Sequence, residues 1–376
     1  MTQPLPLACF IAGCVALAFW LEQQCRWAGK IGATLLVIAF GAVASNTGLV
    51  PLHAPIYDVI FGPVTSLAIV WLLFAVNLGD LKKAGPTMLK AFGLALLGTA
   101  AGAILTSWLF HAVFPEQYWR LAGTLMGTYS GGSLNFVSVG RALDLPAAYF
   151  SATAAADNVV TALWFAATLL LPAVLYRWRK GNITPSPSEP ELARDQPLQL
   201  NLPFRLTDIA ILLALGLGLI WVSQALGNMV PALPEVLILS TLALVMGHFK
   251  PVQNLQGAFP LGLLAIHVFF VLIGISSKFS EILTLGLEVF YLTALLVAIH
   301  GIVLFGLAAM FRIDQQTTAV ASQAAIGGPS TAMAIAISLK RNDLVLPGLV
   351  VGLLGYALGT YLGFAVAYLA RMLWGG

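Results

Sequence analysis

Apolar runs separated by short polar connections cover most of this chain. A helix needs about 20 consecutive apolar residues to span a bilayer, and twelve runs come near that length. They lie at about 6–22, 31–48, 57–78, 88–114, 119–143, 146–177, 207–226, 232–249, 258–276, 282–311, 316–340 and 344–374. The pattern predicts an all-α polytopic membrane protein with about 12 transmembrane helices, within a range of about 11–13.

Polar, glycine-paired segments interrupt two of these runs. The first is Gly127-Thr128-Tyr129-Ser130-Gly131-Gly132-Ser133-Leu134-Asn135, and the second is Ala325-Ile326-Gly327-Gly328-Pro329-Ser330-Thr331. A bilayer has no water for free backbone groups, so the chain can leave the helix there only inside protein or beside a water-filled cavity. Paired interruptions at corresponding places in two halves are typical of transporter binding sites.

A hydrophilic segment divides the chain into halves of similar size. It is rich in charged residues, proline and serine, which is typical of a linker. We therefore expect a first transmembrane repeat over 1–177, a linker over 178–206 and a second transmembrane repeat over 207–376. The short motifs Leu78-Gly79-Asp80 and Ile273-Gly274-Ile275 precede the two interruptions at nearly equal distances, which favours duplication.

The relative orientation of the two repeats does not follow directly from the apolar runs. Inverted repeats require corresponding helices to be an odd number of crossings apart, whereas the two interrupted runs are six apart. Either one span between 144 and 315 is miscounted, or the repeats run parallel. We favour a miscounted span, in the region 207–249, and hence inverted repeats.

Composition and charge agree with a membrane protein. Only 9% of the residues are charged and 59% are hydrophobic, whereas soluble domains carry about 25% charged residues. The net charge of +3 is too small to indicate nucleic-acid binding. The first apolar run has no basic residue before it and no small-residue cleavage site after it, so we expect a transmembrane helix and not a signal peptide.

The two interruptions supply the candidate substrate site. Half-helices that meet inside the membrane expose N–H groups at one end and carbonyl groups at the other, with opposite partial charges of about half an elementary charge. Nearby side chains add hydrogen-bonding groups. The predicted substrate-binding residues are Thr128, Tyr129, Ser130, Gly131, Gly132, Ser133, Asn135, Gln323, Gly327, Gly328, Ser330 and Thr331. The alternative is a helix-packing face of small residues.

An acidic residue follows the first interruption, inside the next apolar run. Asp157 and Asn158 lie in its middle, where an ionisable side chain costs at least about 2.5 kcal/mol and is expected to face a cavity or partner. We predict an ion-binding site in which Asp157 holds Na⁺, or takes up and releases a proton. The structural alternative is an aspartate that satisfies N–H groups at a half-helix end. The matching place in the second half, 355–360, has no carboxylate.

Other polar residues in apolar surroundings are weaker candidates. Arg141 lies near the mouth of the first predicted cavity and could attract an anion. His267 and His300 are single histidines in helices; each is either a hydrogen-bonded core residue or a proton relay. Enzymatic motifs such as Gly-x-Ser-x-Gly, His-Glu-x-x-His and the P-loop are absent from the sequence. We expect no enzyme activity and no cofactor beyond a coupling ion.

Several of these motifs together resemble a known family. The first interruption followed by Ala155-Ala156-Asp157-Asn158 is similar to the YjcL-like family of uncharacterised bacterial membrane proteins. The segments Ile326-Gly327-Gly328-Pro329-Ser330-Thr331-Ala332, Leu346-Pro347-Gly348 and Gly355-Tyr356-Ala357-Leu358-Gly359-Thr360-Tyr361-Leu362-Gly363 strengthen the resemblance. It covers nearly the whole chain except the linker.

That family is grouped with the cation:proton antiporter and anion transporter superfamily. The resemblance implies an antiporter-like core domain with two crossed, broken helices, a panel domain, a homodimer and a bacterial inner-membrane location. In sodium/proton antiporters of this group an acidic pair binds the ion; here the pair reads Asp157-Asn158, so the second acid is missing.

The sequence therefore predicts an ion-coupled secondary transporter. It would move a small organic anion or zwitterion with Na⁺ or H⁺ by alternating access around the two broken helices. A monovalent cation/proton antiporter without an organic substrate is the alternative. The expected partners are the lipid bilayer and a small-molecule or ion substrate. A sensor or scaffold is disfavoured, because no signalling domain is attached and the polar interruptions would serve no purpose.

Overall fold

The computed structural model describes residues 3–76, 79, 81–178, 205–230, 233–276 and 279–374. These ranges form helices and short connections, without a β-strand. The predicted linker over 178–206 lies outside the described residues except at its two edges. The predicted all-α architecture is confirmed for the described part of the chain.

The helices follow the order of the apolar runs. The first half contains α1 (Pro4–Gln24), α2 (Arg26–Ile31), α3 (Ala33–Asn46), α4 (Pro55–Val59), the π-helical turn η1 (Ile60–Val64), α5 (Thr65–Phe74), α6 (Leu81–Phe110), α7 (Tyr118–Thr128), α8 (Ser133–Ala142) and α9 (Ala147–Trp178). The second half contains α10 (Leu206–Met229), α11 (Glu235–Gly247), α12 (Lys250–Gln253), α13 (Ala258–Ile275), α14 (Phe279–Met310), α15 (Gln315–Ile326), α16 (Gly328–Ser338), the 3₁₀ turn η3 (Asn342–Leu344) and α17 (Val345–Trp374).

Eight helical segments in the described ranges are long and apolar enough to cross a membrane. They are Pro4–Gln24, Pro55–Phe74, Lys82–Phe110, Ala147–Pro172, Leu206–Met229, Ala258–Ile275, Leu285–Met310 and Asn342–Trp374. The helices α3 and α11 are apolar but shorter. The two remaining runs are the broken pairs α7–α8 and α15–α16. Several membrane spans are thus confirmed, while the full count and the repeats remain predictions.

Prolines and glycines set the irregular points inside the long helices. Pro63 lies in η1, where its missing N–H prevents a regular α-helical bond. In α6 the helix is kinked at Gly85, whose φ of 74° favours glycine. Pro86 follows as the first residue after the kink. π-Helical turns inside α-helices are frequent near functional sites, and η1 borders the cleft described below.

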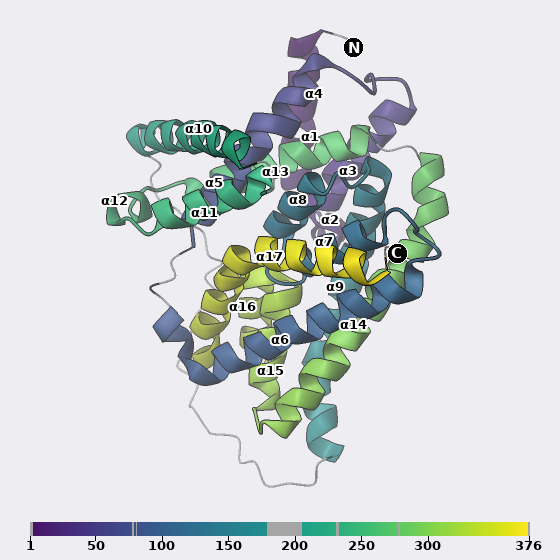
Figure 1. The fold of residues 1–376 in the computed structure, drawn as a ribbon, viewed down its shortest axis with the longest axis vertical. Coiled ribbons are helices and arrows are strands. Elements are labelled where there is room, and N and C mark those ends of the chain that lie inside the picture. The colour runs from purple at the N-terminus through teal and green to yellow at the C-terminus, as the bar shows by residue number, and fades with distance from the viewer. Residues whose placement is uncertain are drawn as a thin grey trace.

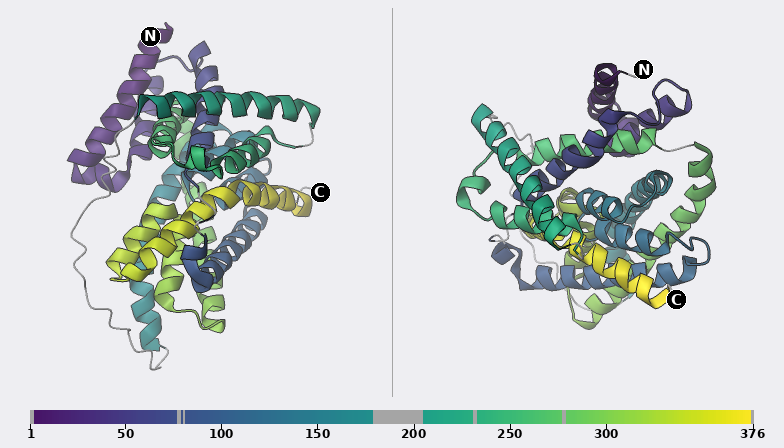
Figure 2. Two further views of the ribbon diagram at one scale, coloured as in Figure 1. Left: turned by 90° about the vertical axis from the view of Figure 1, so that its left-hand side faces the viewer. Right: turned by 45° about the horizontal axis from the view of Figure 1, so that its top comes forward.

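The helices form two groups, visible in the upper and lower parts of Figure 1. The peripheral helices are α1 to α5 and α10 to α13; within them α13 packs against α3, α5 and α1, and α10 packs against α11. The crossing helices are α6 to α9 and α14 to α17; within them α14 packs against α6 and α9, and α17 packs against α7 and α16. Figure 2 shows α17 running through the crossing helices to the C-terminus.

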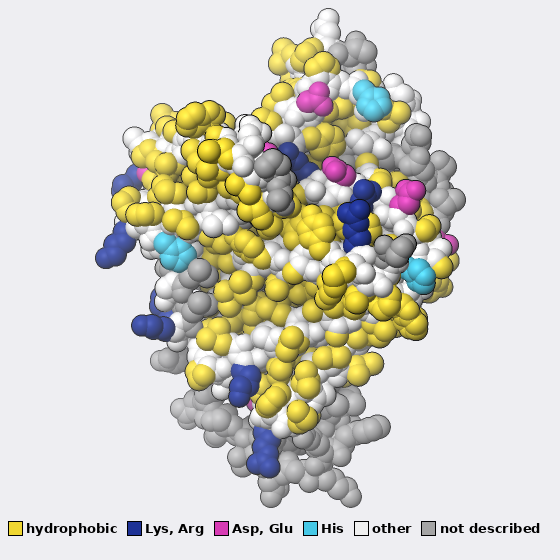
Figure 3. Space-filling view, in the orientation of Figure 1, with side chains coloured by type: hydrophobic (Ala, Val, Ile, Leu, Met, Phe, Trp, Pro, Cys, Tyr) yellow, Lys and Arg dark blue, Asp and Glu magenta, His cyan; other side chains and the backbone are white. Residues whose placement is uncertain are grey.

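The outer surface is largely hydrophobic, and charged side chains are few and scattered on the face seen in Figure 3. Trp221 is 71% exposed, Ile302 is 75% exposed and Leu206 is 83% exposed. Large exposed apolar areas mark contact with a partner or a membrane. Together with the long apolar helices, this surface indicates a lipid bilayer environment.

Candidate functional site

The first break interrupts the helix for a few residues. The α7 helix ends at Thr128 and α8 begins at Ser133. Between them, Gly132 has a φ of 122°, a conformation that side chains disfavour. The break therefore needs glycine at this position, and it exposes the C-terminus of one half-helix and the N-terminus of the other.

The second break is tighter. The α15 helix ends at Ile326 and α16 begins at Gly328, so Gly327 alone separates them. Gly328 has a φ of 82°, and Pro329 occupies the first turn of α16, where a missing N–H is tolerated. The predicted interruption of this apolar run is confirmed.

The two breaks touch each other. A Cβ atom on Gly328 would lie 2.6 Å from the Gly131 carbonyl oxygen. A Cβ on Gly131 would lie 2.6 Å from the Tyr356 nitrogen, and one on Gly355 would collide with the Ser130 carbonyl oxygen. Backbone thus packs on backbone where α7–α8, α15–α16 and α17 meet. This place is called the crossing below, and its glycines serve close packing as well as helix interruption.

Two polar side chains of the first break are bonded inside the protein. The Ser130 hydroxyl donates to the Met126 carbonyl at 2.6 Å. The Asn135 amide donates to the Gly355 carbonyl at 3.0 Å, and its oxygen accepts from the Thr360 hydroxyl at 3.0 Å. Asn135 therefore joins α8 to α17 across the crossing.

Other polar groups near the first break have unused bonding capacity. The Thr128 hydroxyl is buried and has no hydrogen-bond partner among the described residues. Ser133 and, at the second break, Ser330 are exposed, while Gly132 and Gly327 are half-buried. The first turns of α8 and α16 are thus partly exposed, in contrast to the packed glycines Gly131 and Gly328.

The second break keeps its polar side chains mostly internal. The Thr331 hydroxyl lies 2.9 Å from the Gln323 carbonyl and 3.0 Å from the Gly328 carbonyl. The Gln323 amide donates to the Thr168 hydroxyl of α9 at 2.8 Å. The Gln323 side-chain oxygen is buried and lacks a partner in the described part of the chain, so it remains available to a ligand.

Asp157 faces the first break from α9. Its carboxylate accepts a hydrogen bond from the Thr161 hydroxyl, one turn away, at 2.9 Å. The Tyr129 hydroxyl lies within hydrogen-bonding reach of Asp157 and Thr161, although it has no partner at ideal hydrogen-bond geometry among the residues that the structure describes. Two hydroxyl groups and a carboxylate therefore gather here, a set of oxygen atoms that suits a hard cation or a proton.

Asn158 faces a different direction from Asp157. Its amide donates to the Ala154 carbonyl at 2.8 Å. Its side-chain oxygen lies 3.7 Å from the place where a Cβ on Gly32 would stand, and near there Glu22 accepts from the Ala33 N–H at 3.0 Å. The two residues predicted to bind the ion therefore point in different directions. Asp157 points to the crossing, and Asn158 points to the peripheral helices.

A buried chain of hydrogen bonds links the two broken helices. The Thr99 hydroxyl lies 3.0 Å from the Tyr129 carbonyl and 2.9 Å from the His300 Nδ1. The His300 Nε2 lies 2.9 Å from the Ser322 hydroxyl, which accepts from the Trp164 indole at 2.9 Å. Every polar hydrogen of these side chains has an acceptor when Ser322 donates to Nε2 of His300 and His300 carries its proton on Nδ1, facing the Thr99 hydroxyl.

Only a weak signal in the sequence pointed to this chain of bonds. His300 is a histidine in an apolar helix, and the structure places it as a fully buried, hydrogen-bonded core residue. Thr99 and Trp164 carried no signal, because their role depends on helices far apart in the sequence. His267 is likewise bonded, to Leu263 and Thr34.

A cleft of about 290 Å³ lies between the crossing helices and the peripheral helices. Its lining comes from the end of α8, the start of α9, η1 and α13, and comprises Phe61, Arg141, Asp144, Leu145, Ala147, Phe150, Phe269, Ile273 and Ser276. Arg141 donates from α8 to the Gly62 carbonyl at 3.5 Å and to the Ser66 hydroxyl at 3.3 Å. Arg141 therefore lies at the boundary between the two helix groups.

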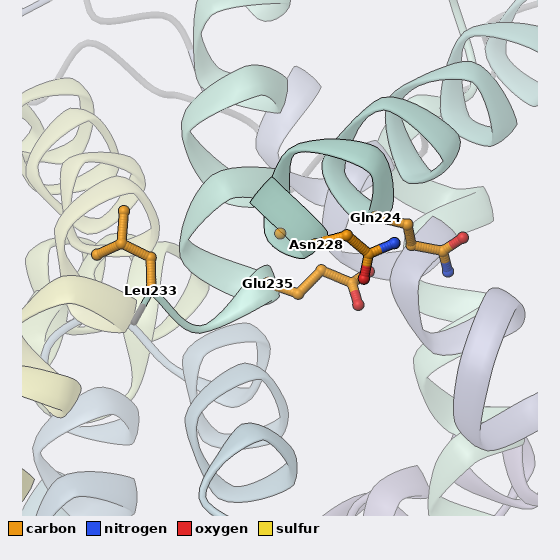
Figure 4. A pocket seen from close by; sticks show the side chains of 5 residues that line it. Gln224, Asn228, Leu233 and Glu235 are labelled. Atoms are coloured by element: carbon orange, nitrogen blue, oxygen red, sulfur yellow. The ribbon is translucent and has the colours of Figure 1, made fainter. Parts of the chain in front are cut away.

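A second, more polar pocket of about 420 Å³ lies where α10 ends and α11 begins. Figure 4 shows Asn228 between Glu235 and Gln224, with Leu233 on the opposite side. Glu235 is the acidic residue whose charge acts on Arg141, but its side chain extends toward Asn228 and Gln224.

These features define a helical membrane protein with several spans, in which two broken helices cross beside a single acidic residue. The chain belongs to the family described as "Protein of unknown function (DUF819)", whose model matches residues 9–373. It is 30% identical over 376 residues to the "Uncharacterized membrane protein YjcL" of Bacillus subtilis (strain 168), covering 94% of this chain and 93% of that protein. The resemblance based on the broken-helix motifs is thus confirmed at the level of the family.

Proposed function

We propose that the protein is an ion-coupled secondary transporter of a small organic anion or zwitterion in the bacterial inner membrane. The observation that carries this proposal is the crossing itself. Gly131 of one break meets Gly328 of the other, and Asp157 faces Tyr129 of the first break. Interrupted backbone deep in a membrane protein is tolerated only inside protein or beside a water-filled cavity, and paired interruptions of this kind are typical of transporter binding sites.

The coupling ion is assigned to Asp157. In a low-dielectric environment an unpaired carboxylate favours a bound cation or a proton. The Thr161 and Tyr129 hydroxyl groups can turn their oxygen atoms to Na⁺, or donate to the carboxylate when no cation is bound. A single carboxylate at this place favours one coupling charge per transport cycle.

The arrangement of the elements supports membership of the cation:proton antiporter and anion transporter superfamily. Both halves place a short apolar helix second, a long helix fourth and a broken helix fifth, and α6 of the first half packs against α14 of the second. We infer two inverted repeats. This relation requires an odd number of crossings between the two broken helices, so one of the twelve runs, in the region 207–249 that contains the short helix α11, would not be a full crossing. The crossing helices would be the core and the peripheral helices the panel, with a homodimer as the assembly.

A monovalent cation/proton antiporter without an organic substrate is the second candidate. It is favoured by the internal bonding of Ser130, Asn135 and Thr331, which leaves few side chains at the crossing for a solute. Asp157 would carry the ion in either case, so the two functions differ in the need for a solute and not in the site of coupling.

Flux measurements in proteoliposomes test the proposal and separate the two candidates. Purified protein is reconstituted around a pH-sensitive dye, and a Na⁺ gradient is imposed with and without a mixture of small carboxylates and amino acids. Ion flux that requires the mixture supports solute coupling, and flux without it supports the antiporter. Absence of flux under both conditions, with pH gradients of either sign also tested, contradicts the transporter proposal.

A further inference from the structure

The cleft between α8 and α13 holds two opposite charges apart. Arg141 and Asp144 both line it and are only three residues apart, yet no ion pair within 4 Å joins them or joins Arg141 to any other acidic residue among those described. The hydrogen bonds from Arg141 to the Ser66 hydroxyl and the Gly62 carbonyl, at 3.3 and 3.5 Å, are longer than the usual 2.7–3.2 Å. Because neither charged group is engaged in an ion pair with the other, both can contact a ligand in the cleft.

Asp144 is exposed at the mouth of the cleft. Its φ is 52°, the left-handed conformation at the end of α8. Its N–H donates to the Arg141 carbonyl and the Leu145 N–H donates to the Gly140 carbonyl, which fixes the backbone of this turn. The carboxylate is thus held near Arg141 by the helix end and not by an ion pair.

The remaining wall of the cleft is aromatic and apolar. The rings of Phe61 and Phe269 are 5.7 Å apart and those of Phe150 and Phe269 are 5.8 Å apart, in edge-to-face arrangements that fix the wall. Phe61 comes from η1, Phe269 from α13 and Phe150 from α9. A ligand body seated here would contact both helix groups at once.

We propose that this cleft binds a small zwitterion with an apolar side chain, of the α-amino acid class. Its carboxylate would pair with Arg141, its ammonium group with Asp144 and its side chain with the phenylalanine wall. The lining has one positive and one negative charge, so a neutral ligand with both charges matches it better than a simple anion does. The volume of about 290 Å³ is at the lower end of ligand pockets, about 300–1,000 Å³, which limits the ligand to this size.

This inference rests on the proposed function, because it names the substrate class of the transporter. It also moves the organic substrate away from the crossing. Arg141 lies eight residues after Ser133, about 12 Å along α8, and Phe150 lies seven residues before Asp157, about 10 Å along α9. The solute would then lie near the end of α8 and the start of α9, and the coupling ion would lie further along α9, beside the first break.

Equilibrium binding to the purified full chain tests the cleft without requiring transport. The probes are L-phenylalanine, L-phenylalaninamide, which lacks the carboxylate, 3-phenylpropionate, which lacks the ammonium group, and glycine, which lacks the apolar body. We expect L-phenylalanine to bind at least about ten times more tightly than each of the other three. L-phenylalaninamide and 3-phenylpropionate each lose one charged contact, and glycine loses the apolar contact with the phenylalanine wall.

Two variants assign the charges. Arg141→Gln should weaken L-phenylalanine binding at least tenfold and leave the binding of L-phenylalaninamide unchanged. Asp144→Asn should weaken L-phenylalanine and leave 3-phenylpropionate unchanged; asparagine tolerates the left-handed backbone at this position. Arg120→Gln, a cation outside the cleft, is the control, and melting temperatures verify that each variant is folded.

The proposal is overturned if folded wild-type protein does not bind L-phenylalanine, if Arg141→Gln binds it as tightly as wild type, or if 3-phenylpropionate binds as tightly as L-phenylalanine. Asp157→Asn separates this result from the proposed function. It should keep L-phenylalanine binding and lose ion-coupled flux. Loss of binding with intact Asp157-dependent flux would refute the cleft alone.

Discussion

At the scale of single residues, Asp157 and the side chains of the two breaks differ in their free capacity for hydrogen bonds and ions. The Asp157 carboxylate accepts a hydrogen bond from the Thr161 hydroxyl, and the Tyr129 hydroxyl lies beside it. Ser130 and Asn135, by contrast, are bonded to the protein itself. The polar groups of the breaks are therefore not equivalent, and the group near Asp157 is the one with capacity for an ion.

Tyr129→Phe tests that assignment. Because the hydroxyl has no partner at ideal hydrogen-bond geometry among the described residues and only approaches Asp157 and Thr161, its removal should change the melting temperature little. It should weaken the apparent affinity for the coupling ion several-fold, since one oxygen near Asp157 is lost. Ion-concentration dependence of flux is the measurement, and Tyr368→Phe, on the surface of α17, is the control. An unchanged ion affinity would remove Tyr129 from the ion site.

Reactivity with a water-soluble thiol reagent distinguishes the solvent-accessible parts of the breaks from the packed parts. Ser133→Cys and Ser330→Cys, made in a chain without its native cysteines, should react with a small water-soluble thiol reagent, because both serines are exposed. Ser138→Cys is the matched control, since Ser138 is 1% exposed and donates to the Leu134 carbonyl. Equal inertness of all three cysteines in membranes would favour lipid-covered packing over a wet cavity.

The sequence indicated Asp157 and both breaks, because a charge or a glycine pair is conspicuous inside an apolar run. It could not indicate that Asn135 bonds to Gly355 or that Asn158 turns toward Gly32, since these contacts join segments far apart in the chain. Arg141 was a weak candidate for the same reason: its significance comes from phenylalanines on three other elements.

At the scale of elements, close backbone approach holds the broken helices in place. Gly131, Gly328 and Gly355 have no space for a methyl group at the crossing, whereas the helical glycines Gly93 and Gly306 do. The predicted interruptions were therefore correct as breaks in the helix. The sequence did not reveal that they are also packing contacts, because either use requires the same small residues.

Gly328→Ala should be strongly destabilising. The added methyl group would lie 2.6 Å from the Gly131 carbonyl, at a φ of 82° that disfavours side chains, so we expect a loss of about 2 kcal/mol or more. Gly306→Ala in α14 is the control, since a Cβ there would meet no described atom within 4 Å, and it should be neutral or stabilising by up to about 1 kcal/mol. Thermal unfolding in detergent compares the two variants. Equal melting temperatures would contradict the close backbone contact at the crossing.

His300→Leu tests the bonds between the two broken helices. The change removes the hydrogen bonds that His300 makes with Thr99 Oγ1 and Ser322 Oγ, while Thr99 keeps its bond to the Tyr129 carbonyl and Ser322 keeps that from the Trp164 indole. Each lost buried hydrogen bond costs about 0.5–1.5 kcal/mol. His248→Leu, at an exposed position, should change stability by less than about 0.5 kcal/mol. If both variants melt at the wild-type temperature, the buried chain of bonds does not hold α6, α14 and α15 together.

At the scale of the whole molecule, the twelve apolar runs predicted the positions of the helices closely. Each run overlaps one helix or one broken pair. The grouping into peripheral and crossing helices was not accessible from the sequence without the family resemblance, because apolar faces that meet lipid and faces that meet protein are equally hydrophobic. The break between α2 and α3 at Gly32 and the π-helical turn η1 also gave no periodicity signal.

The account as a whole depends on Asp157 as the group that holds the coupling ion beside the crossed breaks. Transient currents on a solid-supported membrane report ion binding and translocation directly, after a rapid jump in Na⁺ concentration or pH. We predict a current for wild-type protein and its loss in Asp157→Asn, with both proteins folded and equally reconstituted. A current of wild-type size from Asp157→Asn would contradict the account.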